Sequence, residues 1–440
     1  MAVATAEPTP AEQPAVSFRE ALRFWVYLGF VNFGGPAGQI ATMHRELVDR
    51  KKWISEPAYL RALNFCTLLP GPEAQQLAIY IGWRLHGIKG GIVAGAFFVI
   101  PSIFVLLALS WLSVAHTDVP AIAGLFYGVQ AVVIAIVVEA VVRIGKRALK
   151  HRALYAFAAA AFFALYVLSV PFPLVIAAAA VAGLLLQRRW PQVFQAQGHG
   201  GQADEGPRAA DERAEATYPP ISRALTFIAV FLVLWAIPVG ALLAWKGSAH
   251  VLVQEALFFT RAAFITFGGA YAVLSYIAKQ AVEHYGWLDT GQMVQGLGLA
   301  ETTPGPLIMV TQYVGFVGAW NQGGDPRLGY AILGALVTTY VTFLPCFLFI
   351  FVGAPYIEAL ANNRRLQAAL VAITAAVVGV ILNLAVFFAR HVLLPDDGGL
   401  DWFALVLAVG AFILAWRVHV PIHYLVLIGA VLGMVWTLAT

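Results

Sequence analysis

The chain has 440 residues, of which 60% are hydrophobic and only 11% are charged, with a formal net charge of +4. A soluble domain carries about 25% charged residues, so this composition excludes an ordinary soluble protein and favours helices that face lipid. Two cysteines are too few for a disulfide framework or a four-cysteine metal site. The basic residues lie beside apolar stretches, which argues against nucleic-acid binding.

Residues 1–16 are rich in alanine, proline and glutamate and lack the basic start of a signal peptide, so we expect a flexible tail. Long apolar stretches then alternate with short polar ones through residues 17–187, which we assign to a first repeat. The longest polar stretch, 188–220, is predicted to be a solvated linker on the cytoplasmic side. An additional apolar span at 221–246 precedes a second repeat at 250–440.

The assignment of two repeats depends on landmarks that recur at one spacing. They are Phe33-Gly34-Gly35 with Phe267-Gly268-Gly269, Trp53 with Trp287, and Pro70-Gly71-Pro72 with Pro304-Gly305-Pro306. Each pair is separated by the same 234 positions (33 to 267, 53 to 287 and 70 to 304). Farther along, Pro101 matches Pro345 at a spacing of 244. Such self-similarity predicts two structurally related halves.

Basic residues gather at some connections between apolar spans and are missing from others. The basic clusters are Arg143 to Arg152, Arg188-Arg189, Arg364-Arg365 and Arg417, whereas the connections at His116 to Asp118 and Asp396-Asp397 lack Lys and Arg. By the positive-inside rule, the basic connections are cytoplasmic. The single additional span then turns the second repeat upside down, with a cytoplasmic N-terminus and an external C-terminus. In this scheme Lys246 and Arg390 fall on the external side.

Each repeat begins with apolar pieces that are too short to span a bilayer. We expect them to form hairpins that enter the membrane and return, turning at Gly34-Gly35, Pro70-Gly71-Pro72 and their copies. The first repeat would pair Phe18–Phe33 with Ala37–Leu47 and Ala58–Leu69 with Glu73–Trp83. The predicted fold is therefore an all-α polytopic membrane protein. It has two inverted-topology repeats and membrane-embedded helical hairpins broken at Gly-Gly and Pro-Gly-Pro turns.

Helices that begin inside a membrane predict an anion site, because their N-termini carry unpaired N–H groups and partial positive charge. Pro72 and Pro306 are expected to open such half-helices; the alternative is a tight turn at the membrane surface. Amides and hydroxyls near the turns can coordinate oxyanions. The candidate substrate-binding residues are Asn32, Gly34, Gly35, Gln39, Gly71, Glu73, Gln75, Gln76, Thr266, Gly268, Gly269, Thr303, Gly305, Thr311 and Gln312.

Carboxyl groups in apolar surroundings can bind and release protons during transport. Glu73 and Glu301 are the candidates for this role, although Glu73 could instead cap its half-helix. Glu139 is expected to pair with Arg143, four residues later on one helix face. No nucleotide-binding loop, metalloprotease motif, catalytic triad or metal cluster is recognisable, so we expect neither an enzyme nor a cofactor or metal.

The stretches Asn32–Pro36 and Leu69–Trp83 resemble the signatures of the chromate ion transporter family in its long, two-half form. The resemblance implies export of chromate from a bacterial cytoplasm across the inner membrane, linked to the proton-motive force. The expected partners are chromate or a similar oxyanion, protons and the bilayer, with a homodimer left open. A sulfate transporter, an anion channel and a non-transporting scaffold or sensor are the alternatives. The second repeat has Leu307 in place of Glu73, so the repeats are not chemically equivalent.

Overall fold

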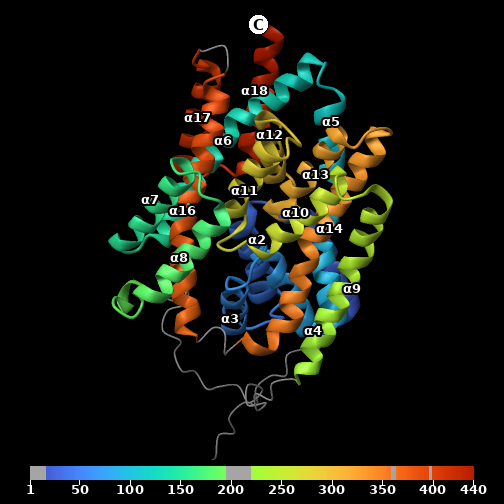
Figure 1. Ribbon diagram of the computed structural model, residues 1–440, viewed down its shortest axis with the longest axis vertical. Helices are drawn as coiled ribbons and strands as arrows, with labels where there is room; N and C mark the ends of the chain where they lie inside the picture. The colour runs from blue at the N-terminus through green and yellow to red at the C-terminus, as the bar shows by residue number, and fades with distance from the viewer. Residues whose placement is uncertain (1–15, 195–219, 358–362, 396–398) are drawn as a thin grey trace, which may run out of the picture.

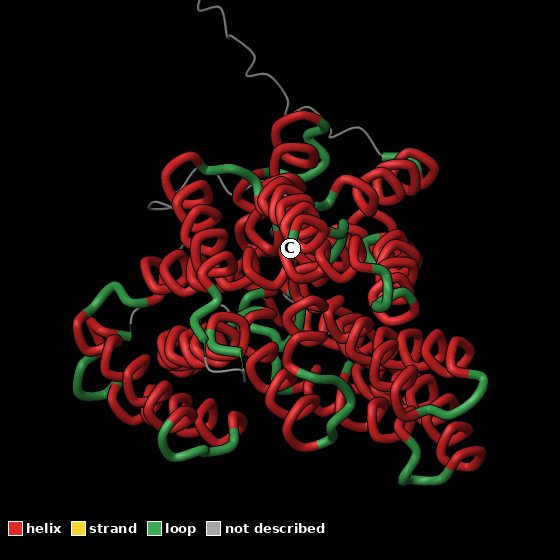
Figure 2. Tube along the Cα trace, turned by 90° about the horizontal axis from the view of Figure 1, so that it is seen from above, coloured by secondary structure: helices red, strands yellow, loops and turns green. Residues whose placement is uncertain are grey.

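The computed structural model describes residues 16–194, 220–357, 363–395 and 399–440. The predicted tail up to residue 15, most of the predicted linker (195–219) and Asp396-Asp397 lie outside these ranges. Within them, regular structure is entirely helical, and a view along the long axis shows the helices side by side (Figure 2).

The first repeat contains eight α-helices among its described residues. They are α1 (Phe18–Val31), α2 (Gly35–His44), α3 (Glu56–Cys66), α4 (Glu73–Phe97), α5 (Ile100–Ala115), α6 (Pro120–Ala148), α7 (Arg152–Tyr166) and α8 (Phe172–Leu186). Non-helical backbone at His86 and Gly87 divides α4 into two segments. The arms of the first predicted hairpin are therefore α1 and α2. Those of the second are α3 and the first segment of α4.

The second repeat follows α9 (Ile221–Lys246) and has the same order of elements. It contains α10 (Val251–Phe264), α11 (Ala270–Lys279), α12 (Thr290–Thr302), α13 (Val310–Gln322), α14 (Arg327–Gly353), α16 (Arg364–Leu393), α17 (Trp402–Ile413) and α18 (Ile422–Ala439). Helix α13 corresponds to the first segment of α4, and α14 corresponds to its second segment together with α5. A π-helical turn follows α2 at Arg45–Arg50 and recurs after α11 at Gln280–His284.

Six helical segments of the described chain are long and apolar enough to cross a membrane, which makes the chain a multi-pass membrane protein. They are Glu73–Ala115, Pro120–Ala148, Ile221–Lys246, Arg327–Tyr356, Arg364–Leu393 and Ile422–Ala439. Shorter apolar helices supplement them at Arg152–Tyr166, Phe172–Leu186 and Trp402–Val418. Helix α9 exposes most of its apolar side chains at the edge of the molecule, as expected for a surface that faces lipid (Figure 1).

The repeats are intertwined as well as inverted. Helices α7 and α8 pack on α16 of the second repeat, and α17 and α18 pack on α6 of the first. Small residues permit both contacts: a Cβ added at Gly183 would lie 2.6 Å from the Ala368 carbonyl oxygen, and one at Gly433 would lie 2.4 Å from that of Gly124. Figure 1 shows α3 toward the lower end of the long axis and its counterpart α12 toward the upper end.

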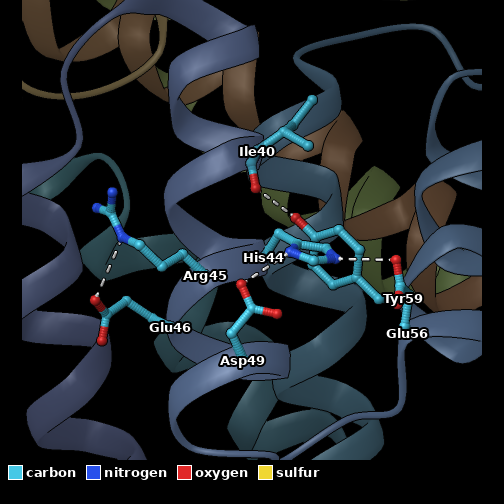
Figure 3. A network of polar contacts seen from close by, with 7 residues as sticks. All are labelled: Ile40, His44, Arg45, Glu46, Asp49, Glu56 and Tyr59. Carbon is cyan, nitrogen blue, oxygen red and sulfur yellow. Dashed lines mark hydrogen bonds and ion pairs between the residues drawn. The ribbon is translucent and has the colours of Figure 1, made fainter.

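A polar network joins α2 to α3 at the lower end of the first repeat (Figure 3). The Tyr59 hydroxyl donates to the Ile40 carbonyl oxygen at 2.6 Å. The imidazole of His44 lies 3.5 Å from an Asp49 carboxylate oxygen and 3.7 Å from one of Glu56. These contacts tie the end of α2, the π-helical turn and the start of α3 together.

Candidate functional site

The two Pro-Gly-Pro turns meet the two Gly-Gly breaks at one place, through a reciprocal pair of backbone hydrogen bonds. The Gly71 N–H donates to the Thr266 carbonyl oxygen at 2.8 Å, and the Gly305 N–H donates to the Asn32 carbonyl oxygen at 3.0 Å. Gly71 and Gly305 are 234 positions apart, and so are Asn32 and Thr266. An approximate two-fold axis therefore relates the two contacts. Each turn is therefore held by the broken helix of the other repeat.

Glycine is required in both turns by backbone conformation and by close packing. Gly71 has φ +117° and Gly305 has φ +109°, values that disfavour any side chain. A Cβ at Gly71 would lie 3.3 Å from the Cys346 sulfur, and one at Gly305 would lie 2.8 Å from Ser102 Cβ. Ser102 and Cys346 were missed by the sequence analysis, although each follows one of the matched prolines, Pro101 and Pro345.

Several buried polar atoms around these turns have no hydrogen-bond partner among the described residues. They are both amide atoms of Asn32, the side-chain carbonyl oxygens of Gln39 and Gln76, the Ser102 hydroxyl and one carboxylate oxygen of Glu301. A buried polar group without a partner costs about 1–3 kcal/mol. A concentration of them at one place is characteristic of a site that binds a polar ligand or water.

The candidate glutamines differ in what their amide groups contact. Gln39 Nε2 donates to the Gly305 carbonyl oxygen at 2.5 Å, and Gln76 Nε2 donates to that of Pro70 at 2.7 Å, so both stabilise the turns. The amides of Gln75 and Gln312 instead donate to the carbonyl oxygens of Gly95 (3.2 Å) and Ile103 (2.8 Å), within helix packing contacts.

The candidate threonines occupy buried positions near helix ends. The hydroxyls of Thr266 and Thr303 donate to carbonyl oxygens of their own helices, at Ala262 (2.6 Å) and Ala300 (3.4 Å). Thr311 in α13 is buried with no partner for its hydroxyl among the described residues. The candidate glycines Gly34, Gly35, Gly268 and Gly269 all have positive φ at the Gly-Gly breaks.

Both prolines predicted to open half-helices immediately precede helical segments. Pro72 precedes α4, whose first residue is Glu73. Pro306 precedes a short 3-10 turn, Leu307–Met309, that leads into α13. The first N–H groups of α4 have no partners within the helix and point toward the turn. Glu73 is half-buried at this position.

Glu301 forms a contact that the first repeat cannot copy. The Tyr271 hydroxyl donates to a Glu301 carboxylate oxygen. The equivalent positions hold Ala37 and Thr67, whose side chains are too short to meet in this way. Arg143 lies near enough to Tyr271 and Glu301 to interact electrostatically.

The predicted partner of Arg143 is confirmed. Its Nε donates to a Glu139 carboxylate oxygen at 3.0 Å, one turn earlier on α6. This ion pair is partly buried and lies on α6, the helix on which α12 packs. The centre of the molecule therefore holds a guanidinium group, a neighbouring carboxylate and the Tyr271–Glu301 contact.

The two sides of this centre differ in exposure. Thr67 is exposed beside the first Pro-Gly-Pro turn, whereas its equivalent Glu301 is buried. Helix α11 packs on α16, and α12 packs on α6 and α18. The equivalent helices α2 and α3 make no extensive contact with α6, α8 or α16 within the described residues. Fewer helices therefore cover the centre on the side of the first repeat, which we call the open side, than on the side of the second repeat, which we call the closed side.

Glu255 in α10 is a further acidic residue that the sequence analysis did not select. It is fully buried, and neither carboxylate oxygen has a hydrogen-bond partner among the described residues. A Cβ at Gly318 would lie 2.6 Å from one of these oxygens, and one at Gly334 would lie 3.1 Å from the other. An acidic residue inside the apolar run Val251–Phe264 was the available signal.

Inverted, intertwined repeats whose broken helices meet at a polar centre define a membrane transport protein. The family model described as "Chromate transporter" matches residues 19–184 and 253–434. The chain belongs to the chromate transporter family.

Relatives of nearly the same length support this assignment. The chain is 32% identical to the chromate transport protein of Pseudomonas aeruginosa, over 98% of this chain and 95% of that protein. It is 29% identical to the chromate transport protein of Cupriavidus metallidurans, over 86% and 84% of the two chains. It is 26% identical to a probable chromate transport protein of Synechococcus elongatus, over 96% of each. No solved structure matches the chain significantly.

Proposed function

We propose that the protein exports chromate from the bacterial cytoplasm across the inner membrane, holding the anion where the two turns meet the two Gly-Gly breaks. The observation that carries this proposal is the set of unpaired polar atoms around the reciprocal backbone contacts of Gly71 and Gly305. The names of the relatives supply the identity of the anion.

The proposed coordination uses hydrogen bonds, with positive charge at a distance. The Asn32 amide and the Ser102 hydroxyl offer unpaired donors, and the first N–H groups of α4 add others. Gln39 and Gln76 hold the turns in place, and Glu73 borders the site. Arg143 contributes a positive potential from α6. Such a site would bind a tetrahedral oxyanion through its oxygens.

The proposed orientation places the lower end of Figure 1 in the cytoplasm. The helices α9 and α16 begin at that end, and α16 begins with Arg364 and Arg365. The connection between α5 and α6, which lacks Lys and Arg, lies at the upper end with the C-terminus. The positive-inside rule then makes the N-terminus cytoplasmic and the C-terminus periplasmic. The described conformation would be open to the cytoplasm.

Cysteine labelling tests this orientation. A Thr67→Cys variant should react with a membrane-impermeant maleimide in everted vesicles and not in intact spheroplasts, because Thr67 is exposed on the open side. Thr303→Cys is the control, since Thr303 is 4% exposed. The native cysteines, Cys66 and Cys346, are buried and should give a low background. Reaction of Thr67→Cys only in spheroplasts would reverse the proposed topology.

The driving force follows from charge. A membrane potential of about 100 mV, inside negative, favours the exit of a divalent anion by about 4.6 kcal/mol of free energy. Proton antiport would add to this, and we propose Glu73 and Glu301 as the proton-binding residues. Glu73 borders the open side, and Glu301 closes the other side with Tyr271, so protonation of either would alter access to the anion.

Two substitutions test the proposed site by transport. In everted vesicles that accumulate labelled chromate, Gln76→Ala should lower the initial rate about tenfold, because loss of one hydrogen bond to a buried turn costs about 1–3 kcal/mol. Glu73→Gln should lower the rate and remove its stimulation by a pH gradient. Gln187→Ala at the end of α8 and Glu20→Gln on α1 are the matched controls. Normal rates in both test variants, at normal protein levels, would eliminate this site.

Sulfate is the second candidate substrate, because hydrogen bonds to tetrahedral oxygens discriminate poorly between two divalent oxyanions. The same vesicles distinguish the candidates: loss of chromate uptake in the presence of excess sulfate would favour a general oxyanion transporter. Flux without any dependence on pH would favour a channel.

A further inference from the structure

A polar cavity lies on the closed side of the centre. It has a volume of about 510 Å³ and is bordered by α7 of the first repeat and by α11 and α16 of the second. Ser275 and Lys279 line it from α11, and Asn383, Arg390 and His391 line it from α16. We call this space the outer cavity.

One face of α11 leads from the proposed central site to the outer cavity. Tyr271, Ser275 and Lys279 follow one another at intervals of four residues, which places them on the same helix face. The interval corresponds to about 6 Å of helix per step. Tyr271 contacts Glu301 at the inner end, and Lys279 borders the cavity at the outer end. The Tyr271–Glu301 contact therefore lies between the centre and the outer cavity.

The cationic groups of the outer cavity are available to a ligand. Lys279 has no ion pair among the described residues, and the only polar partner described for the Arg390 guanidinium is the Tyr166 hydroxyl at 3.5 Å. Among the described residues, Glu283 is the one carboxylate that lines the cavity, so this lining carries an excess of positive charge.

The equivalent cations of the first repeat are already engaged. Arg45, the equivalent of Lys279, lies 3.9 Å from a Glu46 carboxylate oxygen, as Figure 3 shows. Lys146, the equivalent of Arg390, lies over the Trp416 ring at 3.9 Å from its centre. The availability of Lys279 and Arg390 is thus a property of the second repeat alone.

We propose that the outer cavity is a second binding site for a divalent oxyanion, occupied on the exit side after the Tyr271–Glu301 contact opens. The proposal rests on the proposed function, because it takes the anion and the direction of movement from it. Lys279 and Arg390 bind the anion, and the Tyr166 and Ser275 hydroxyls border it. A cationic cavity beyond the contact would capture the anion before it returns to the centre.

Equilibrium dialysis of the purified full-length protein against labelled chromate at low ionic strength tests this inference. Wild type should bind two chromate ions. The double variant Lys279→Gln, Arg390→Gln should bind one, with an affinity within twofold of the remaining wild-type site. That retained binding also shows that the variant is folded. The charge-conserving pair Lys279→Arg, Arg390→Lys should again bind two.

A matched control removes the same charge elsewhere in the second half of the chain. Lys246→Gln, Arg327→Gln lies outside the cavity and should bind two ions. Asn32→Ala should weaken binding of the central ion and leave the outer one, whose binding should weaken as salt is added. If wild type binds one ion and the Lys279, Arg390 variant binds it equally well, the outer site is wrong and the central site stands. If wild type binds no chromate, the result contradicts the proposed function itself, and the outer site falls with it.

Discussion

Replacing Gly71 with alanine is expected to abolish chromate transport while leaving much of the protein in the membrane. A residue with a Cβ is strained at φ +117°, by about 1–3 kcal/mol. The added Cβ would also lie 2.9 Å from Gln76 Nε2 and 3.3 Å from the Cys346 sulfur. The turn would have to move, which would break the Gly71 N–H bond to Thr266 and displace the start of α4.

The measurement is initial uptake into everted vesicles, normalised to the amount of protein that elutes as a single species in detergent. Gly240→Ala in α9 is the control, because its Cβ would meet no atom within 4 Å. Gly305→Ala should resemble Gly71→Ala, since its Cβ would lie 2.8 Å from Ser102 Cβ. Wild-type transport by Gly71→Ala would show that the turn does not position the site.

Replacing Asn32 with aspartate is expected to weaken chromate binding by at least about a hundredfold. The two side chains have the same shape, but the substitution removes the unpaired Nδ2 donor and introduces a carboxylate. Loss of a hydrogen bond to a charged ligand costs about 1.5–3 kcal/mol, and repulsion between the carboxylate and a divalent anion adds to it. Asn32→Ala, which only removes the donor, should have the smaller effect.

Chromate affinity at the central site, measured by dialysis and by the concentration dependence of uptake, checks this order. Asn363→Asp is the matched control: Asn363 caps α16 by accepting from the Arg365 and Leu366 N–H groups, a role that aspartate fills equally well. Equal affinity in Asn32→Asp and wild type would remove Asn32 from the site. Stronger loss in Asn32→Ala than in Asn32→Asp would contradict the role of charge.

The helices and their breaks could be predicted because local sequence governs them. The additional apolar span expected at 221–246, for example, is helix α9. Pro72 and Pro306 precede helical segments because proline lacks the N–H that a helix interior requires. The Glu139–Arg143 pair followed from helical spacing alone.

The composition of the site could be predicted only in part. The matched motifs pointed to Asn32, Gly71 and Gly305, whose contacts involve backbone atoms at the breaks themselves. Gln75 was selected with Gln76 because the two are neighbours, but consecutive residues face different directions on a helix, and the Gln75 amide donates to Gly95. Tyr271 was not selected, since its importance depends on Glu301, which lies thirty positions away.

The duplicated chain, its two breaks per repeat and its membrane location could all be read from the sequence, because periodicity, turn residues and apolar composition are local properties. Which repeat supports which turn was decided by the tertiary structure. Gly71 binds Thr266, and α7 and α8 pack on α16, through contacts between residues far apart in the chain. The same is true of the closed side: Tyr271 meets Glu301, while their equivalents Ala37 and Thr67 have no such contact to make. Two similar sequences thus form two different sides, because packing between the repeats acts on the few positions at which they differ.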